Sequence, residues 1–377
     1  MENNNSVCYI ARINEIKEIQ GADNIEQGVI GGWNAIIKKG EYKVDDLVII
    51  ATTDAVIPQE LSDAMNVTNY LRKGGRVRTV KLRGVYSECL IIPFHMLVGR
   101  TKIVKTWQGG EDLMESMGIF KYEPPVVQIQ LASGRKLKYH QNPNFGIYYK
   151  FPNLKNVDGM FTEEDEVEIS RKIHGTNARF GIVKKKKVSI WDKVRKLFGA
   201  KYVEYEYVYG SHNVEKGSDS QGFYDTDVWR TVADKYNIRA KLWDLFILSK
   251  DLYDIKDGII IYGEIYGAGI QKNYEYGLNE IEYAGFDVTI NGEYCDTTRS
   301  FMIQNILGLN YVPVLYYGNW NQEIQDSFVF NNFIEGTKVP HEGIVIKTLD
   351  GNRQKVAKVI NPDYLIASEK HNYGDSH

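Results

Sequence analysis

The most informative stretch of this 377-residue chain is Lys172-Ile173-His174-Gly175-Thr176-Asn177. The residues before it, 167–171, predict a short strand that ends at Lys172. Four shorter signatures follow in order: Tyr262-Gly263-Glu264-Ile265-Tyr266-Gly267, Gly285-Phe286-Asp287, Glu342-Gly343-Ile344-Val345-Ile346-Lys347 and Lys355-Val356-Ala357-Lys358. A lone lysine before a glycine carries little information. A lysine followed by two glutamates, an aromatic residue and further lysines predicts one site assembled from distant segments.

Lys172 is the predicted nucleophile of this site. An amine must be unprotonated to attack phosphorus, and a free lysine is almost wholly protonated at neutral pH. Burial, neighbouring cations and a bound metal each lower the pKa of a lysine. We expect Lys355, Lys358 and a divalent ion to supply these conditions.

The order of the signatures resembles the covalent nucleotidyltransferase superfamily, and the stretch at 172–177 is similar to the first motif of its ATP-dependent RNA ligases. The resemblance covers residues 147–366 and points to ligases of the Deinococcus and Naegleria type, which carry an N-terminal OB module. It implies an α+β chain with an OB-like β-barrel at 1–125 and a linker at 126–146. A nucleotidyltransferase domain with antiparallel sheets and flanking helices follows at 147–366. The polar residues after Ser368 themselves predict a frayed end, and we assign a tail at 367–377.

The resemblance also implies the site. Lys172 takes AMP from ATP, Glu264 accepts hydrogen bonds from the ribose, and Phe286 stacks on the purine. Glu342 places Mg²⁺ (or Mn²⁺) at the phosphates, and Lys358 holds the α-phosphate. The residues expected at the nucleotide are Lys172, His174, Gly175, Asn177, Glu264, Phe286, Glu342, Lys347 and Lys358. The expected cofactors are ATP and the divalent cation, with Glu342 as the metal ligand.

Three positions depart from the family pattern or refine it. Many relatives carry a second lysine where this chain has Ile360, and Lys355 is the candidate for the missing charge. His174 stands where most DNA ligases and capping enzymes have aspartate, whereas RNA-repair ligases often have histidine. Relatives often have a serine-arginine pair where this chain has Ser211-His212, and the role of His212 stays open.

The implied function is ATP-dependent sealing of a 3′-hydroxyl to a 5′-phosphate in RNA, through lysyl-AMP and RNA-adenylate intermediates. We expect a monomer whose partner is RNA, with nicked duplex as the favoured form. Two alternatives stay open. One is a related enzyme, an mRNA capping guanylyltransferase or a DNA ligase, against which His174 argues. The other is a non-catalytic RNA-binding protein with a transferase-like domain, against which the intact set of lysines and glutamates argues.

Composition narrows the class of protein. A formal net charge of −3 excludes a uniformly basic coat but allows a basic groove. The three cysteines, Cys8, Cys89 and Cys295, lie far apart, which fits reduced thiols in an intracellular protein. No apolar run approaches the length of a membrane span and the N-terminus lacks a signal-peptide pattern, so we expect a cytoplasmic protein with no membrane partner.

Three further segments have readable patterns. Strands are predicted at 7–13, 33–38, 47–51, 76–82 and 87–92. In the strand predicted at 76–82, Arg76 and Arg78 either contact phosphates or protect an exposed edge strand from pairing with another chain. The basic run at 184–198 has apolar residues at helical spacing, which predicts an exposed hairpin or short helix that is either a solvated insertion or a contact to polynucleotide. Residues 228–247 predict a helix with Trp229 and Val232 on its core face.

Overall fold

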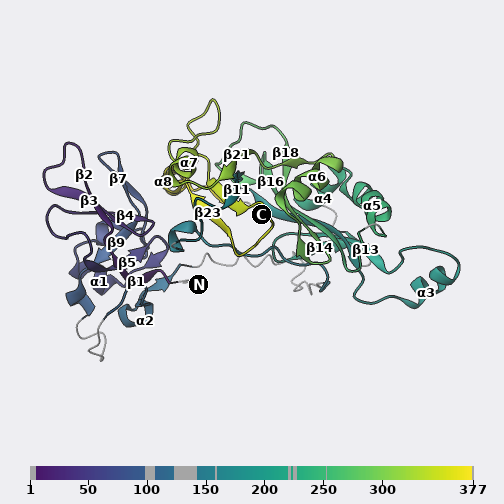
Figure 1. The fold of residues 1–377 in the computed structure, drawn as a ribbon, viewed down its shortest axis with the longest axis horizontal. Coiled ribbons are helices and arrows are strands. Elements are labelled where there is room, and N and C mark those ends of the chain that lie inside the picture. The colour runs from purple at the N-terminus through teal and green to yellow at the C-terminus, as the bar shows by residue number, and fades with distance from the viewer. Residues whose placement is uncertain are drawn as a thin grey trace. The chain divides into compact units, whose positions relative to one another are not determined.

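The computed structural model describes residues 6–97, 107–122, 142–157, 159–219, 222–223, 227–251 and 253–375. The chain forms two compact units: unit 1 is Met1–Ile129 with Pro152–Met160, and unit 2 is Gln130–Phe151 with Phe161–His377 (Figure 1). The segment 152–160 therefore belongs with the N-terminal unit, although it lies within the range predicted for the second domain. Residues 126–141 of the predicted linker lie outside the described residues.

Unit 1 is built from short antiparallel strands. Its elements are β1 (Cys8–Arg12), β2 (Glu15–Glu18), β3 (Ile25–Ile30), β4 (Trp33–Lys38), β5 (Leu47–Thr52), β6 (Ala55–Val56), α1 (Gln59–Ala64), β7 (Val80–Leu82), β8 (Val85–Ser87), β9 (Cys89–Ile92), α2 (Met114–Met117) and β10 (Phe120–Lys121). The orders β1-β5-β9 and β2-β3-β4 define its two larger sheets. Alternating burial along β4 directs Trp33, Ala35 and Ile37 into a core that they share with Ile30 of β3 and with β5.

The predicted strand at 76–82 is shorter than expected, because only Val80–Leu82 is a strand. Arg76 instead forms an ion pair with Asp54 and lies over the ring of Tyr122. Arg78 donates a hydrogen bond to the carbonyl of Tyr70 at 2.9 Å. These interactions hold the segment as a loop, so it presents no continuous strand face of arginines to phosphates. The sequence analysis also missed β2 and β3.

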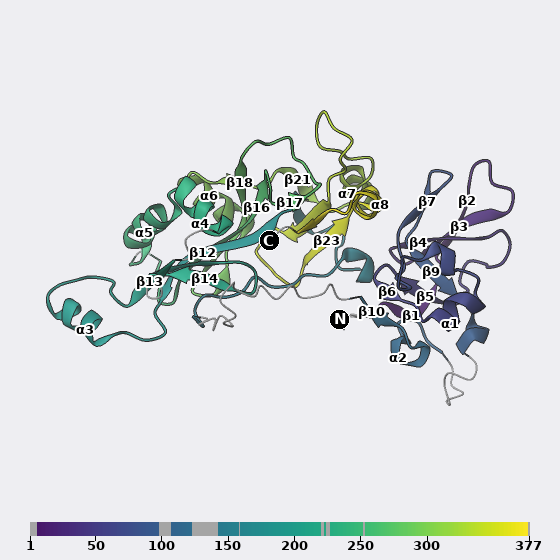
Figure 2. The ribbon, with the colours of Figure 1, turned by 180° about the vertical axis from the view of Figure 1, so that it is seen from behind.

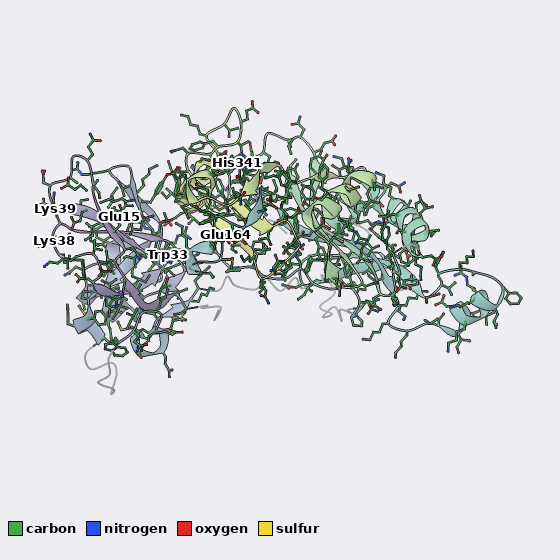
Figure 3. The ribbon with its side chains drawn as sticks, in the orientation of Figure 1. Glu15, Trp33, Lys38, Lys39, Glu164 and His341 are labelled. Atoms are coloured by element: carbon green, nitrogen blue, oxygen red, sulfur yellow. The ribbon has the colours of Figure 1, made fainter. Side chains whose placement is uncertain are left out.

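The segment 152–160 is fixed to unit 1 by a buried ion pair. Lys155 Nζ lies 2.5 Å from Glu88 Oε1, and Asn34 Nδ2 donates to the other carboxylate oxygen at 3.0 Å. The same ammonium lies 5.6 Å from the ring centroid of Trp33, which Figure 3 labels. A Cβ on Gly32 would collide with the backbone of Lys155, so glycine permits this close approach.

Unit 2 contains a four-stranded and an eight-stranded sheet, both antiparallel in their long strands. The four-stranded sheet has the order β21 (Val314–Asn319), β11 (Glu166–Lys172), β22 (Gly343–Thr348) and β23 (Val356–Ile360). The eight-stranded sheet runs β15 (Gly222–Phe223), β14 (Glu215–Ser218), β13 (Tyr205–Gly210), β12 (Thr176–Lys184), β16 (Gly258–Gly267), β18 (Ile281–Ile290) and β19 (Glu293–Tyr294), with β20 (Asn310–Tyr311) beside β18.

The helices of unit 2 are α3 (Ile190–Leu197), α4 (Val228–Lys235), α5 (Ile238–Ser249), α6 (Thr297–Ile306), α7 (Gln322–Val329) and α8 (Pro362–His371). Trp229 of α4, Phe246 of α5 and Ile303 of α6 pack into one core with Phe180 and Ile261 of the eight-stranded sheet. Figures 1 and 2 show these three helices on the same side of that sheet. Strand alternation therefore leaves Asn177, Arg179 and Glu264 on the opposite face.

Two predictions for unit 2 need correction. The helix predicted at 228–247 is two helices, because Asn237 adopts a left-handed conformation with φ of 51° between α4 and α5. Its predicted core residues Trp229 and Val232 are buried, as expected. The predicted frayed tail from 367 is wrong as far as residue 375: α8 continues to His371, and β24 (Gly374–Asp375) pairs with β17 (Gln271–Lys272). Residues 376–377 lie outside the described part.

Candidate active site

One face of the four-stranded sheet gathers the predicted lysines. Lys172 pairs with Gly343 and Gly343 with Ile360, while Lys358 pairs with Val345 and Lys347 with Glu168. Alternation along antiparallel strands places Lys172, Lys347 and Lys358 on the same face. The intervening residues Ile169 and Ile346 are fully buried on the other face. The apolar pattern of the strands thus directs the charged residues to one side.

Lys172 is paired with Glu342 at the end of this face. Lys172 Nζ lies 2.6 Å from Glu342 Oε1, and the two side chains are 24% and 12% exposed. The other oxygen of this carboxylate, Oε2, is buried and accepts no hydrogen bond from the residues the structure describes. His174 Nδ1 lies 3.8 Å from that oxygen. The predicted nucleophile and the predicted metal ligand therefore meet, with one carboxylate oxygen left for a further partner.

The turn after Lys172 is held by its neighbours. The backbone N–H of His174 donates to Tyr276 Oη at 2.6 Å, and Gln271 Nε2 donates to the carbonyl of Gly175 at 2.5 Å. Tyr274 and Tyr364 pack edge-on against the His174 ring, with centroid distances of 4.8 and 5.3 Å. These contacts fix the direction in which the turn presents Lys172 and His174.

Gly175 brings the two sheets together at the site. A Cβ at this position would collide with the carbonyl oxygen of Ile265 and with the side chain of Glu264. Asn177 pairs directly with Glu264 across β12 and β16, so their side chains share the face away from the helices. The buried Asn177 Oδ1 has no hydrogen-bond partner among the described residues. This oxygen, beside Glu264, can therefore accept a hydrogen bond from a ligand.

Phe286 lies in a β-bulge of β18. Tyr262 pairs with Asp287 and Gly263 with Gly285, which leaves Phe286 outside the ladder. Its ring meets that of Tyr148 edge-on at 4.9 Å and is partly buried. The bulge frees the aromatic ring from the regular alternation and explains how a residue between two buried neighbours reaches the site.

Lys347 lies in a buried charge network instead of an open site. Its ammonium is 3.2 Å from Glu168 Oε1 and 3.4 Å from Asp287 Oδ1, and it donates to the carbonyl of Phe286 at 2.8 Å. Arg353 Nη2 adds a second cation 2.8 Å from Asp287 Oδ1. Burial by itself lowers the pKa of Lys347, but the carboxylates of Asp287 and Glu168 raise it above its ordinary value.

Lys355 is not brought to Lys172. It precedes β23, next to Val356, which pairs with Lys347 at the end of the sheet away from Lys172. Its Nζ lies 2.5 Å from Asp165 Oδ1. Burial alone would raise the pKa of Asp165, but the hydrogen bonds from Lys355 and Thr162 lower it. Lys358, in contrast, lies on the same face of the sheet as Lys172. It is two residues along β23 from Ile360, which is in register with Lys172 through Gly343.

Two histidines lie near the site without contacting Lys172. His212 follows Ser211, whose carbonyl accepts a 2.8 Å hydrogen bond from Arg179 Nε. Burial, together with Lys150 and Arg179, lowers the pKa of His212. His341 precedes Glu342 and is labelled in Figure 3. Burial and the neighbouring Arg171 lower its pKa to about 4, so His341 is neutral at physiological pH.

Sequence reasoning missed the residues that support this site. Glu168, Asp287 and Arg353 form the charge network behind Phe286. A signal was present for Glu168, because Glu168 and Ser170 alternate with Val167 and Ile169 along the strand that leads to Lys172. Polar residues at alternate positions of a strand indicate a second, polar face.

Across the described ranges, no group of three or more His, Cys, Asp or Glu side chains is placed to hold a metal ion. One carboxylate oxygen of Glu342 has no hydrogen bond. A single carboxylate suits Mg²⁺, which keeps several waters and binds mainly through substrate phosphates. The donors present therefore fit a cation that arrives with a nucleotide.

Unit 2 has a partly buried lysine-carboxylate pair at the end of an antiparallel sheet, and unit 1 is a module of short strands; together they indicate the class of protein. The family model for RNA ligase matches residues 165–360, and that for an OB-fold domain matches residues 7–94. The chain belongs to the RNA ligase family, and its predicted α+β class with an N-terminal OB module is confirmed. A comparison with curated protein sequences found no match.

Solved structures of the Naegleria gruberi RNA ligase share the fold. An apo mutant has 21% identity and a TM-score of 0.69, covering 97% of this chain and 98% of that one. A mutant with ATP and Mn has 22% identity and a TM-score of 0.69, covering 97% and 99%. The enzyme with PPi has 21% identity and a TM-score of 0.66, covering 97% and 99%. No helix in the described part of the chain is both long and apolar enough to cross a membrane.

Proposed function

We propose that this RNA ligase uses ATP and a divalent cation, Mg²⁺ or Mn²⁺, to join a 3′-hydroxyl to a 5′-phosphate in RNA. The observation that carries the proposal is the 2.6 Å pair of Lys172 and Glu342 at a strand end, with a second carboxylate oxygen lacking a hydrogen bond. The similar Naegleria gruberi structures hold ATP with Mn, AMP with Mn, and PPi, which are the reactants and products of such a step.

Lys172 forms the first covalent bond. In the structure its ammonium forms an ion pair with the carboxylate of Glu342. Attack requires the free amine, so nucleotide binding must separate the pair and release the proton. The amine nitrogen then bonds to the α-phosphorus of ATP as the bond from that phosphorus to pyrophosphate breaks. The product is a lysyl-AMP phosphoramide, and pyrophosphate leaves with the electron pair.

The face that carries Asn177 and Glu264 binds the nucleoside. The carboxylate of Glu264 and the unsatisfied Asn177 Oδ1 accept hydrogen bonds from the two ribose hydroxyls. The ring of Phe286 stacks on the purine. Gly175 belongs to this surface because it lets the nucleotide and Glu264 approach the turn closely. His174 faces Glu342 and contributes its ring to the phosphate end.

The three lysines beyond Lys172 have different roles. Lys358 neutralises the α-phosphate, because it shares the face of Lys172. Lys347 does not bind the nucleotide in this proposal: it holds the carbonyl of Phe286 at 2.8 Å and so positions the aromatic ring. Lys355 stabilises the far end of the sheet through Asp165. The divalent cation would be held by Glu342 and the phosphates, and it supplies charge neutralisation when bound.

Two further displacements complete sealing. A 5′-phosphate oxygen of RNA attacks the lysyl-AMP phosphorus and regenerates the Lys172 amine. A 3′-hydroxyl oxygen then attacks the activated 5′-phosphorus, and AMP leaves as the phosphodiester forms. We propose nicked duplex as the preferred RNA, a monomer as the working form and the cytoplasm as the location. Buried free Cys8, Cys89 and Cys295 support a reducing compartment.

The test is the intact mass of the protein after incubation with ATP and Mg²⁺, in protein first stripped of bound AMP with pyrophosphate. We expect a gain of one AMP that is absent in Lys172→Ala, and no gain with GTP. Sealing of a nicked RNA duplex with 3′-hydroxyl and 5′-phosphate ends is then followed on a denaturing gel. RNA binding without any adduct would replace the proposal with a non-catalytic role, and an adduct with GTP alone would indicate a capping-type enzyme.

A further inference from the structure

Residues 185–204, which we name the arm, connect β12 to β13 and carry α3 at their tip. Figures 1 and 2 show α3 standing away from the sheet that the arm leaves. The helix is well formed at its start, because Ser189 and Asp192 make a reciprocal capping box. The arm is therefore an ordered projection of unit 2.

The polar side of α3 faces its own arm. Asp192 is buried and lies 2.9 Å from Lys185 Nζ. Lys196 Nζ lies 3.6 Å from Oε1 of Glu204, the turn residue directly before β13. Both carboxylates of the arm are thus turned inward and paired.

The apolar side of α3 faces solvent. Ile190, Trp191, Leu197 and Phe198 are 79%, 77%, 85% and 87% exposed. At the α-helical step of about 100° per residue, these residues and Val194 occupy a single sector of about 120°. A surface helix of a globular protein normally buries such a sector against the core. In α3 the orientation is the opposite, because its apolar sector faces solvent.

Cations border this sector. The arm holds seven Lys or Arg residues against two Asp or Glu residues, in a chain whose net charge is −3. The same helical step of about 100° places Lys193 on one border of the apolar sector and Arg195 on the other. Both carboxylates lie outside the apolar sector. The exposed side of α3 is consequently an apolar strip edged by positive charge.

We propose that the arm docks on an anionic membrane surface. An interfacial helix buries an apolar face rich in Trp, Phe and Leu at the boundary of the acyl chains while flanking Lys and Arg residues contact anionic headgroups. Ion pairs hold the polar side of α3 against the rest of the arm, so only its apolar side is available for binding. A single exposed side fits a flat membrane surface better than a groove that would enclose the helix. RNA would use the cations but offers no apolar surface to Ile190, Val194 and Leu197.

This inference is independent of the catalytic proposal and departs from the expectation of no membrane partner. It concerns peripheral contact by an eight-residue helix, not a membrane span. The arm lies between β12 and β13 and includes none of the residues proposed to hold the nucleotide. Docking would bring sealing to a membrane surface without altering the chemistry at Lys172.

The experiment is flotation of the full-length protein with vesicles of phosphatidylglycerol and phosphatidylcholine, and with vesicles of phosphatidylcholine alone. Trp191→Ser/Leu197→Ser removes apolar contacts, and Lys193→Gln/Arg195→Gln removes the bordering charges. Leu248→Ser/Ile306→Ser, at positions 81% and 67% exposed on α5 and α6, is the matched apolar control. Lys338→Gln/Lys370→Gln is the matched charge control, because both lysines are exposed.

We expect binding to the anionic vesicles only, reduced about tenfold or more by each arm variant and unchanged by either control. Thermal unfolding and adduct formation with ATP should stay as in the wild type, because the altered side chains are exposed and distant in sequence from the site. Absence of vesicle binding, or binding that the arm variants retain, overturns the proposal. Loss of RNA affinity or of a dimer in those variants, with vesicle binding intact, would assign the arm to RNA or to a second copy.

Discussion

Lys172 and Lys347 occupy the two ends of one face of the four-stranded sheet, and their surroundings are opposite. Lys172 is 24% exposed and has one carboxylate within 2.6 Å. Lys347 is 3% exposed and contacts two carboxylates, the carbonyl of Phe286 and the hydroxyl of Tyr311. Both belong to signatures of the same family resemblance.

These different surroundings bear on which lysine can react. An amine attacks only after it loses a proton and only where a substrate can reach it. The carboxylates beside Lys347 favour its protonated form and bury it, whereas Lys172 stays partly exposed beside Glu342. In the proposed mechanism the first lysine is the nucleophile and the second supports Phe286. Each prediction below changes one side of this comparison.

The largest effect is expected from Lys172→Arg. This variant keeps a positive charge beside Glu342, but a guanidinium cannot be deprotonated in a protein and offers no free amine. We expect no AMP adduct by intact mass, with thermal unfolding close to that of the wild type. Lys241→Arg, at a partly exposed position on α5, is the control substitution. An adduct in Lys172→Arg would assign the nucleophile to another residue.

The next effect separates Lys358 from Lys355. Lys358→Ala removes a charge from the face of Lys172, and we expect adduct formation to slow by about 100-fold, as for other groups that stabilise a transition state. Lys355→Ala removes the partner of Asp165 at the far end of the sheet. We expect a change of less than about threefold there, since a partly exposed pair contributes little. The measurement is the single-turnover rate of adduct formation. Equal losses in both variants would restore Lys355 to the phosphate site.

The third effect concerns stability. Lys347→Met leaves the buried carboxylate of Glu168 without its cation, and breaking a buried pair in this way costs about 3–5 kcal/mol. Lys172→Met should change the free energy of unfolding by less than about 1 kcal/mol, because its pair is partly exposed. Urea unfolding measures both. Glu168→Gln/Lys347→Met should recover part of the loss, and equal stability of the two single variants would remove the distinction between the two ends.

The sequence predicted the end of the sheet at Lys172 better than the end at Lys347. Lys172 ends a strand and the Glu342-Gly343 signature begins one, and antiparallel pairing of these two strands brings them together. The position of Lys347 in its signature led to a predicted contact with ATP. The structure adds contacts of Lys347 with Glu168 and Asp287, and Asp287 follows the bulge at Phe286. A bulge shifts register in a way that a pattern of period two does not reveal.

The same limit applies to α3. Its apolar residues at helical spacing predicted an amphipathic helix, and the structure contains one at Ile190–Leu197. The direction of the apolar sector depends on tertiary contacts such as Asp192 with Lys185, which determine the side that faces the protein. Periodicity defines a face but not what covers it. The break at Asn237 is a similar case, since a left-handed residue is a local conformation that apolar spacing does not record.

The smallest effect is a pH dependence that sharpens the comparison at Lys347. Its pKa is raised above the ordinary value of about 10.4. A group whose pKa is higher in the folded state contributes all of its stabilisation below the pKa of the unfolded chain, and loses it as the pH rises through the folded pKa. The wild type should therefore lose stability above pH ~10.4 by up to about 1.4 kcal/mol per pH unit more than Lys347→Met.

Tyr148 and Tyr283 also have raised pKa values because they are buried, so both proteins should weaken at alkaline pH. Their contribution cancels in the difference between wild type and Lys347→Met, which leaves the lysine together with Tyr311, the hydroxyl that it contacts. Urea titrations from pH 9 to 11.5 give this difference directly. If the difference in free energy of unfolding between the two proteins stays constant with pH, Lys347 titrates as in the unfolded chain. Its neighbouring carboxylates would then not raise its pKa. In that case its distinction from Lys172 would rest on access alone.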